Sequence, residues 1–382
     1  MVHEASLCSA NLRQQRCLSQ KGFELANGLP FVASDAAIHD LCAARSIPEA
    51  LNLQRTLGKL RRASGHFKGQ LLIIDPHRLP SFSKRQMTRN KDNDAQPACK
   101  VSQTFFCLDA DTAQPICFTT GSSSRSVAQA TPELLQLAAD ILNPQALRPL
   151  VLADTEHWSG ELFQHVREHT LFDLLVPMPN QPAYRQAWCA IPASAFTSPW
   201  VGWATTKQPF YFEHLPDLPL IQFVQRAGES ASALVFKAFL GTADRNEIQA
   251  LSLDYPKRWH IEEFFHTTQD LGWKRAGTLN LNIRYAQMTM ALIAQAALYQ
   301  LRQRLGFPWL NYESRPFAQK LLRGLDGDIR VNHDTILVTF YNAPNAERWR
   351  QHFEHLPDRL ASENISPHIP WLYNFKLDFR FR

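Results

Sequence analysis

Two short apolar runs that each precede an aspartate place the strongest constraint on how this chain can fold. Residues 71–74 are followed by Asp75, and residues 150–153 are followed by Asp154. Apolar runs of this length are typical of strands buried inside a parallel or mixed sheet. A crossover connection of the usual handedness brings two such strands together, with both carboxylates at one edge of the sheet. The pattern predicts an α/β fold with an acidic pair at the strand ends.

A third carboxylate, Glu262, lies in a segment that carries helix signals. Asp254 is a residue type that caps helix N-termini. Pro256 is tolerated in a first turn, because its missing N–H needs no partner there. We therefore expect a helix that starts just before Tyr255 and carries Glu262 about two turns further on.

Four polar residues share one face of this expected helix. At about 100° per residue, Tyr255, Arg258, Glu262 and Gln269 fall within about 60° of one another. A guanidinium offers a two-pronged fork and a phenol offers one donor, and this combination suits a phosphate group. The face therefore predicts a phosphate contact beside a carboxylate.

Carboxylates from two strands and a helix would form a cage for a divalent metal ion such as Mg²⁺, which prefers oxygen ligands. Phosphodiester chemistry uses such ions to hold the attacking and leaving oxygens. Simpler roles compete with this interpretation, because Asp75 and Asp154 could each cap a turn or helix. Asp109 and Asp111 are competing ligands, yet the chemistry of a hairpin turn explains them.

The spacing Tyr255-x2-Arg258-x3-Glu262 resembles the Y-x2-R-x3-E-x6-K signature of DDE transposases from bacterial insertion sequences. The last signature position is Gln269 here, which keeps hydrogen-bonding capacity and loses the charge. Lys274 lies five residues further on, at about 100° from Tyr255 on a regular helix, so it is a poor substitute. Segments 74–78, 83–85, 104–112 and 151–157 also resemble the surroundings of the first and second aspartates in this family, and the likeness covers roughly residues 65 to 300.

The resemblance implies an RNase H-like core in which Asp75, Asp154 and Glu262 bind Mg²⁺, or Mn²⁺ in its place. It implies two-metal hydrolysis at a transposon end, followed by attack of the freed 3′-OH on target DNA. The expected partners are double-stranded DNA, as terminal inverted repeats and as target, and a second copy of the chain on that DNA. The expected DNA contacts are Tyr255, Arg258, Gln269, Lys274 and Arg275.

The order of predicted elements divides the chain into five parts. Strand, hairpin, helix, strand and helix follow one another from residue 70 to residue 176, as an RNase H-like mixed sheet with flanking helices requires. We expect a polar loop from Pro76 to Lys100, where prolines and asparagines interrupt regular structure. The predicted parts are an N-terminal helical region with DNA binding as one candidate role (1–65), the first core segment (66–176), a β-rich insertion (177–243), the second core segment with the catalytic Glu helix (244–312) and a C-terminal module (313–382).

The β-rich insertion carries short alternating stretches punctuated by proline. In the family that the chain resembles, an insertion at this place helps to hold the DNA end, and a flipped base can stack on an exposed aromatic side chain. Trp188, Trp200 and Trp203 are the candidates. In the C-terminal module, a hairpin across residues 332–334 and a last strand at residues 374–381 are expected, without an assigned role.

Charge is unevenly distributed along the chain. Residues 101–250 hold 14 acids and 8 bases, a local charge of −6, whereas the whole chain carries +5, so the flanks carry +11. Residues 51–74 and 271–312 each contain five bases and no acid. Such segments beside a carboxylate-rich centre suit phosphate contacts, although basic residues can also simply keep a fold soluble.

Composition narrows the class of protein further. With 382 residues, 45% of them hydrophobic, the chain can bury a large core. Seven cysteines without a C-x-x-C pair favour reduced thiols in a cytoplasmic protein, which would be nucleoid-associated when bound to DNA. The most apolar stretch, residues 288–301, is too short to span a bilayer and is expected to be a core helix, so no membrane partner is predicted.

Two alternative functions stay open at this point. A metal-dependent nuclease on the same core would cut DNA without strand transfer. A decayed or domesticated transposase would bind DNA without catalysis, and Gln269 is the residue that favours this alternative. Terminal inverted repeats around the coding frame would favour transposition over the nuclease.

Overall fold

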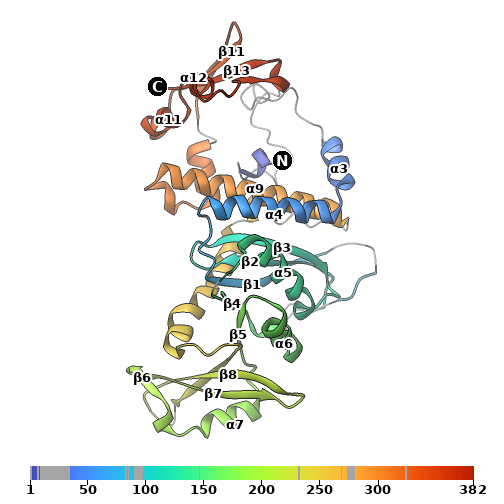
Figure 1. Ribbon diagram of the computed structural model, residues 1–382, viewed down its shortest axis with the longest axis vertical. Helices are drawn as coiled ribbons and strands as arrows, with labels where there is room; N and C mark the ends of the chain where they lie inside the picture. The colour runs from blue at the N-terminus through green and yellow to red at the C-terminus, as the bar shows by residue number, and fades with distance from the viewer. Residues whose placement is uncertain are drawn as a thin grey trace. The chain divides into compact units, whose positions relative to one another are not determined.

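The computed structural model (Figure 1) describes residues 2–6, 8, 35–81, 84, 86–89, 98–145, 147–230, 233–267, 269–272, 280–322 and 325–382. The chain forms two compact units. The core unit is built from residues 51–266, and the terminal unit combines the described parts of residues 1–50, 267–275 and 280–382. Each unit is considered by itself below.

The core unit contains a nine-stranded mixed sheet in the order β3-β2-β1-β4-β5-β9-β8-β7-β6. Strands β1, β4 and β5 are parallel, and the other neighbours pair antiparallel. The predicted fold class is confirmed, since a mixed sheet with flanking helices receives a β-rich insertion before the Glu262 helix. The strands are β1 (Leu71–Pro80), β2 (Val101–Asp109), β3 (Gln114–Ser122), β4 (Leu150–Leu152), β5 (Asp173–Pro177), β6 (Thr197–Trp200), β7 (Trp203–Phe212), β8 (Leu215–Ala227) and β9 (Val235–Gly241).

Helices cover the sheet of the core unit. Helix α5 (Val127–Leu142) packs on β2 and β3, and its first turn is closed by a capping box between Ser126 and Gln129. Helix α6 (Gly160–His169) begins at the N-cap Ser159 and packs on β5. Helix α4 (Ile47–Ala63), whose first residues belong to the terminal unit, and helix α7 (Pro182–Cys189) in the insertion also contribute to this unit.

Strand β1 alternates its side chains between the two faces of the sheet. Leu72 and Ile74 belong to the large apolar cluster that also contains the buried residues of α5. Asp75, one residue on, therefore points to the opposite face. The strand continues to Pro80, paired residue by residue with β2, so the predicted loop from Pro76 is wrong for residues 76–80. Strand β4 pairs only with residues 71–73, and a proline is tolerated where a strand no longer has two paired edges.

Glu262 lies in a continuous helical segment that starts earlier than predicted. Helical residues 247 and 248 lead into a π-helical stretch (Gln249–Asp254), a 3-10 stretch (Tyr255–Trp259) and α8 (His260–Thr267). Asn246 Oδ1 accepts the Gln249 N–H at 2.9 Å, so Asn246 is the cap and the prediction of Asp254 is wrong. Pro256 therefore lies inside the segment, where its ring and missing N–H disfavour regular α-helix. The change from wide π turns to tight 3-10 turns falls at this point.

The terminal unit joins helices to a second sheet. Helix α9 (Leu281–Leu305) packs against α1 (Val2–Ser6) and α3 (Asp35–Ala44). The sheet has the order β10-β11-β13-β12 and consists of β10 (Gly327–Asn332), β11 (Thr335–Phe340), β12 (His368–Ile369) and β13 (Phe375–Phe381), accompanied by α10 (Ser314–Phe317), α11 (Ala346–Phe353) and α12 (Leu356–Ser362). The expected hairpin across residues 332–334 and the expected last strand are confirmed.

The apolar stretch 288–301 lies within α9, with Met288, Leu292 and Leu298 buried, as expected of a core helix. Among the described residues, no helix combines the length and the apolar character that crossing a membrane requires.

Candidate active site

Asp75 lies in β1, and Asp154 lies two residues beyond the end of the neighbouring parallel strand β4. Ile73 of β1 pairs with Leu152 of β4, and each aspartate lies two residues beyond its member of this pair. Adjacent strands are about 4.8 Å apart. The sheet register therefore brings these two carboxylates together, although they are far apart in the sequence.

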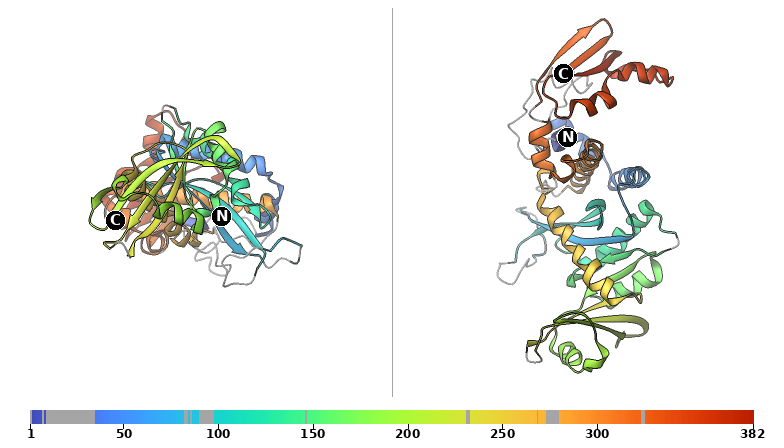
Figure 2. Two further views of the ribbon diagram at one scale, coloured as in Figure 1. Left: turned by 90° about the horizontal axis from the view of Figure 1, so that it is seen from below. Right: turned by 90° about the vertical axis from the view of Figure 1, so that its left-hand side faces the viewer.

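The face of β1 that carries Asp75 is covered by α8. Phe106 lies directly opposite Asp75 on β2 and so points to the same face. Its ring is 5.4 Å from that of Phe264 and 5.5 Å from that of Phe265, both on α8. In Figure 2 the helical segment that ends in α8, drawn in yellow to orange, runs along the sheet. Because α8 also carries Glu262, this aromatic packing directs the third carboxylate to the Asp75 face.

The charges of the neighbouring carboxylates act on Asp75. The pKa of Asp75 is raised well above its usual value, first by burial and then by the charges of Asp154, Glu156 and Glu262, whereas Arg258 opposes the shift. A carboxyl surrounded by other carboxylates is costly to ionise unless a cation compensates. These four carboxyl groups are called the acidic cluster below, and Asp75 is the member whose ionisation is disfavoured.

The pKa of Asp154 is shifted in the opposite direction to that of Asp75. Burial alone would raise its pKa, but hydrogen bonds from His157 and from the Glu156 N–H outweigh burial and lower the pKa. The His157 Nδ1 lies 2.9 Å from Asp154 Oδ1, and the Glu156 N–H lies 3.0 Å from the same oxygen. The expected capping role of Asp154 is thus present, and it engages Oδ1. His157 is only 2% exposed, and its part at the site was missed, since its spacing resembles no ligand pattern.

Tyr255 and Arg258 reach the site from the 3-10 stretch before α8. The Tyr255 hydroxyl donates to the Ala153 carbonyl at 3.2 Å, directly before Asp154. Arg258 Nη2 donates to Glu262 Oε1 at 2.8 Å. Tyr255, Arg258 and Glu262 therefore all contribute to the site, as their predicted common face indicates. Helix α8 ends at Thr267, so the angular argument does not extend to Gln269.

The side chains of three other predicted DNA contacts lie outside the described structure. Gln269 begins a 3-10 turn (Gln269–Leu271) of the terminal unit. Its side chain lies outside the described structure. Lys274 and Arg275 lie outside the described residues altogether.

An ion pair beside the aspartates was also missed by sequence reasoning. Arg78 Nη1 donates to Glu156 Oε1 at 2.7 Å, and Nη2 contacts Oε2. Arg78 follows Asp75 by three residues and Glu156 follows Asp154 by two. The only available signal was this short spacing of charges after each aspartate.

The competing acids Asp109 and Asp111 have the structural roles that turn chemistry predicts. Asp109 is fully buried and accepts from the Gly69 N–H at 2.7 Å and the Thr112 N–H at 2.9 Å. Asp111 pairs with Lys257 Nζ at 2.6 Å.

Several bases of the two acid-free segments work inside the fold. Arg61 and Arg284 are 3% and 2% exposed. Arg55 pairs with Asp140 at 2.7 Å, and Arg302 contacts the Tyr312 carbonyl. The interpretation of both segments as phosphate-facing surfaces is therefore wrong for Arg61 and Arg284, because periodic sequence does not reveal which long side chains are enclosed.

The three tryptophans of the insertion differ in exposure. Trp188 is 1% exposed and stacks with Tyr184, so it is a core residue and not a stacking platform. Trp200 is 52% exposed at the β6–β7 turn, with its ring 5.0 Å from that of Trp203. Trp200 is the candidate for contact with a DNA base.

The donor set fits a hard divalent cation. Asp75, Asp154 and Glu262 supply carboxylate oxygens, and the raised pKa of Asp75 reflects a repulsion that a cation would relieve. Among the described residues, however, no three Asp, Glu, His or Cys side chains are grouped closely enough to hold an ion as they stand.

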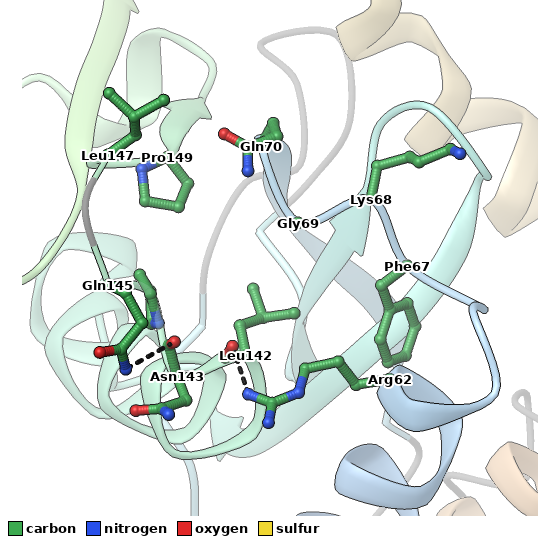
Figure 3. A pocket seen from close by; sticks show the side chains of 11 residues that line it. Arg62, Phe67, Lys68, Gly69, Gln70, Leu142, Asn143, Gln145, Leu147 and Pro149 are labelled. Atoms are coloured by element: carbon green, nitrogen blue, oxygen red, sulfur yellow. Dashed lines mark hydrogen bonds between the residues drawn. The ribbon is translucent and has the colours of Figure 1, made fainter.

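A cavity of 280 Å³ lies elsewhere in the core unit (Figure 3). Its lining includes Phe67, Lys68, Leu142 and Pro149, which precede β1 or β4 in the chain or end α5. The aspartates follow the paired part of the same strands, so this cavity lies at the other end of the sheet from the acidic cluster.

Comparison with known proteins gives one match that covers most of the core. The family model described as transposase DDE domain matches residues 66–296, a range that includes Asp75, Asp154 and Glu262. No match was found among curated protein sequences.

Solved structures show weaker similarity. A piggyBac transposase synaptic complex with hairpin DNA is 11% identical, with a TM-score of 0.40, and the alignment covers 83% of this chain and 68% of that one. The Mos1 strand transfer complex is 12% identical, with a TM-score of 0.18, and 44% and 56% are covered. The Mos1 mariner paired end complex with Mn is 13% identical, with a TM-score of 0.20, and 47% and 60% are covered. Similarities this low add no argument to the family match.

Proposed function

The chain belongs to the transposase DDE domain family, whose members cleave DNA and transfer strands, and from this premise we propose that Asp75, Asp154 and Glu262 are its metal-binding catalytic residues. The observation that carries the proposal is the sheet register, which places Asp75 and Asp154 at one edge of the sheet, together with the packing of the Glu262 helix on the Asp75 face.

The proposed reaction is hydrolysis followed by transesterification. Water attacks the phosphorus at a transposon end and the 3′ oxygen leaves as a hydroxyl, which then attacks a phosphorus of target DNA and displaces another 3′ oxygen. Bound Mg²⁺, with Mn²⁺ as a substitute, would activate the attacking oxygen and stabilise the leaving oxygen. Divalent-metal dependence is general in the family, and the choice of ion is part of the proposal.

The chain's own residues have distinct proposed tasks. His157 holds Asp154 through Oδ1. The other carboxylate oxygen, Oδ2, is the one proposed to bind the metal ion. Arg258 and Tyr255 grip a phosphate near the cut, through a guanidinium fork and a phenol. Gln269, Lys274 and Arg275 are proposed as further DNA contacts, and Trp200 as a base contact of the insertion.

The wider setting is proposed on the same premise. Terminal inverted repeats and target DNA are the partners, two copies of the chain pair the two ends, and the protein works in the cytoplasm on the nucleoid. The five-part division at residues 65, 176, 243 and 312 is retained as a functional proposal.

Cleavage of DNA that carries the repeats flanking the gene tests the proposal. We expect metal-dependent nicking at the repeat end and joining to a second DNA by the wild type. Asp154→Asn should bind the same DNA in a gel-shift assay without cutting it. Glu133→Gln, which removes a carboxylate of an ion pair outside the acidic cluster, serves as the matched control.

The outcomes of this assay separate the alternatives. Cutting without joining would favour the nuclease. Binding without metal-dependent cutting by the wild type would favour the non-catalytic protein. Equal cutting by wild type and Asp154→Asn would remove Asp154 from the catalytic set.

A further inference from the structure

Arg258 contacts one of the proposed metal ligands directly. Its Nη2 lies 2.8 Å from Glu262 Oε1, one helical turn further along the chain. The Arg258 side chain is 17% exposed and that of Glu262 is 38% exposed. Solvent therefore screens this pair less than an ion pair on the open surface.

The charges around Arg258 extend beyond Glu262. Burial acts to lower the pKa of Arg258, but Tyr255, Glu262 and Asp75 outweigh it and raise the pKa. Arg258 in turn lowers the pKa of both Asp75 and Asp154 relative to what burial alone would give. The guanidinium is thus a cation shared by all three proposed metal ligands.

The fourth carboxylate of the acidic cluster, Glu156, is paired with another arginine. Glu156 makes its two-pronged pair with Arg78, so Arg78 is engaged away from Glu262. The described side chains also do not yet group closely enough to hold an ion.

We propose that Arg258 is the internal counterion of the metal-free carboxylate cluster and competes with the divalent cation for Glu262. Transfer of the guanidinium to a DNA phosphate then releases Glu262 to the metal. The proposal rests on the proposed function of the three carboxylates. Its consequence is that DNA and metal bind cooperatively, because each removes the other's competitor, and such coupling is reciprocal.

A simpler role for Arg258 predicts the opposite result. If Arg258 only held Glu262 in the geometry that a metal needs, its removal would weaken metal binding. If Arg258 competes with the metal, its removal abolishes the repulsion between the guanidinium and the metal ion. It also frees the Glu262 carboxylate from its ion pair with Arg258. Metal affinity should then increase.

Calcium titration of the full chain without DNA distinguishes these roles. We expect Arg258→Gln to bind Ca²⁺ roughly tenfold more tightly than the wild type, as loss of a nearby positive charge predicts. Lys257→Gln is the matched control, because it removes the same charge from the adjacent residue, whose Nζ pairs with Asp111. Its affinity should change less than about twofold. Equal or weaker binding by Arg258→Gln would overturn the proposal.

A second arm measures the wild type itself and so does not depend on the folding of a variant. Ca²⁺ affinity is compared with and without a duplex that carries the flanking repeat. The wild type should bind Ca²⁺ more tightly in the presence of the duplex, and Arg258→Gln should lose most of that gain. Unchanged Ca²⁺ affinity of the wild type on addition of a duplex that it binds would also overturn the proposal.

Failure of the counterion role is distinguishable from failure of the proposed function. Asp154→Asn should lose the Ca²⁺ site. If the wild type and Asp154→Asn bind Ca²⁺ equally, the three carboxylates are not a metal site and the proposed function fails. If only Asp154→Asn loses Ca²⁺ while Arg258→Gln gains nothing, the metal site stands and the counterion role is wrong.

Discussion

Arg78 and Glu156 form a two-pronged ion pair that joins the end of β1 to the turn after β4. The two residues are 78 positions apart in the chain. Arg78 Nε also donates to Gln103 Oε1 on β2 at 3.0 Å. The pair therefore ties together the segments that carry Asp75 and Asp154, and it fixes their spacing where β4 no longer pairs with β1.

Arg78→Gln should reduce metal-dependent DNA cleavage by about tenfold, because misplaced ligands lose catalytic geometry. Its effect on the free energy of unfolding should be at most about 1 kcal/mol, as for partly exposed ion pairs. The control is Arg125→Gln, which breaks the similarly exposed pair with Glu133 outside the site. Cleavage rates and urea denaturation of both variants measure the effects on catalysis and on stability. Equal losses of cleavage in the two variants would contradict the prediction.

Asp75→Asn and Asp154→Asn should change stability in opposite directions in the presence of a chelator. The raised pKa of Asp75 means that its contribution is favourable below the unfolded pKa and is lost as pH rises through the folded pKa. Above the unfolded pKa the folded environment disfavours the ionised form of Asp75, so Asp75→Asn should raise the melting temperature at pH 7. This gain should shrink as the pH is lowered toward about 4.

The lowered pKa of Asp154 has the reverse consequence. Its contribution is present above the unfolded pKa and is lost as pH falls through the folded pKa. Asp154→Asn should therefore lower the melting temperature at pH 7, and the loss should disappear in acid. Thermal unfolding of the two variants between pH 4 and pH 8, in about half-unit steps, provides the measurement. Shifts of the same sign at pH 7 would refute the paired prediction.

Trp200→Ala should leave the free energy of unfolding within about 0.5 kcal/mol of the wild-type value, since the side chain is exposed. It should weaken binding to the repeat duplex, measured by fluorescence anisotropy. Trp188→Ala is the contrasting variant and should cost about 3–5 kcal/mol, because it empties a buried site. Unchanged DNA affinity in Trp200→Ala would exclude Trp200 as a base contact.

Gly58→Ala should destabilise the core unit by about 1–3 kcal/mol. A methyl group at Gly58 on α4 would lie 2.7–2.8 Å from side-chain atoms of Ile141 on α5, which is fully buried. Chemical denaturation measures the cost. Ile141→Val in the same chain removes one of the crowding methyl groups and should recover part of it. A double variant no more stable than Gly58→Ala would show that crowding with Ile141 is not the cause.

Two local sequence signals predict secondary structure that the fold does not adopt. Pro76 is a local signal for a loop, and Asp254 is a local signal for a helix start. Pairing with β2 kept Pro76 within β1, and Asn246 capped the helical segment earlier. In both places a contact with a neighbouring element or an earlier cap outweighed the local propensity.

The amino-acid sequence alone predicts the buried strands that lead to Asp75 and Asp154, the helix that carries Glu262 and the presence of a β-rich insertion. These features follow from local periodicity, which fixes how each segment can bury its apolar side chains. The contacts of several charged side chains become known only from the folded chain, in which His157 holds Asp154, Arg78 binds Glu156 and Arg61 is enclosed. Such partners depend on sheet register and on packing between distant segments, and a local pattern does not encode which charged side chains then meet.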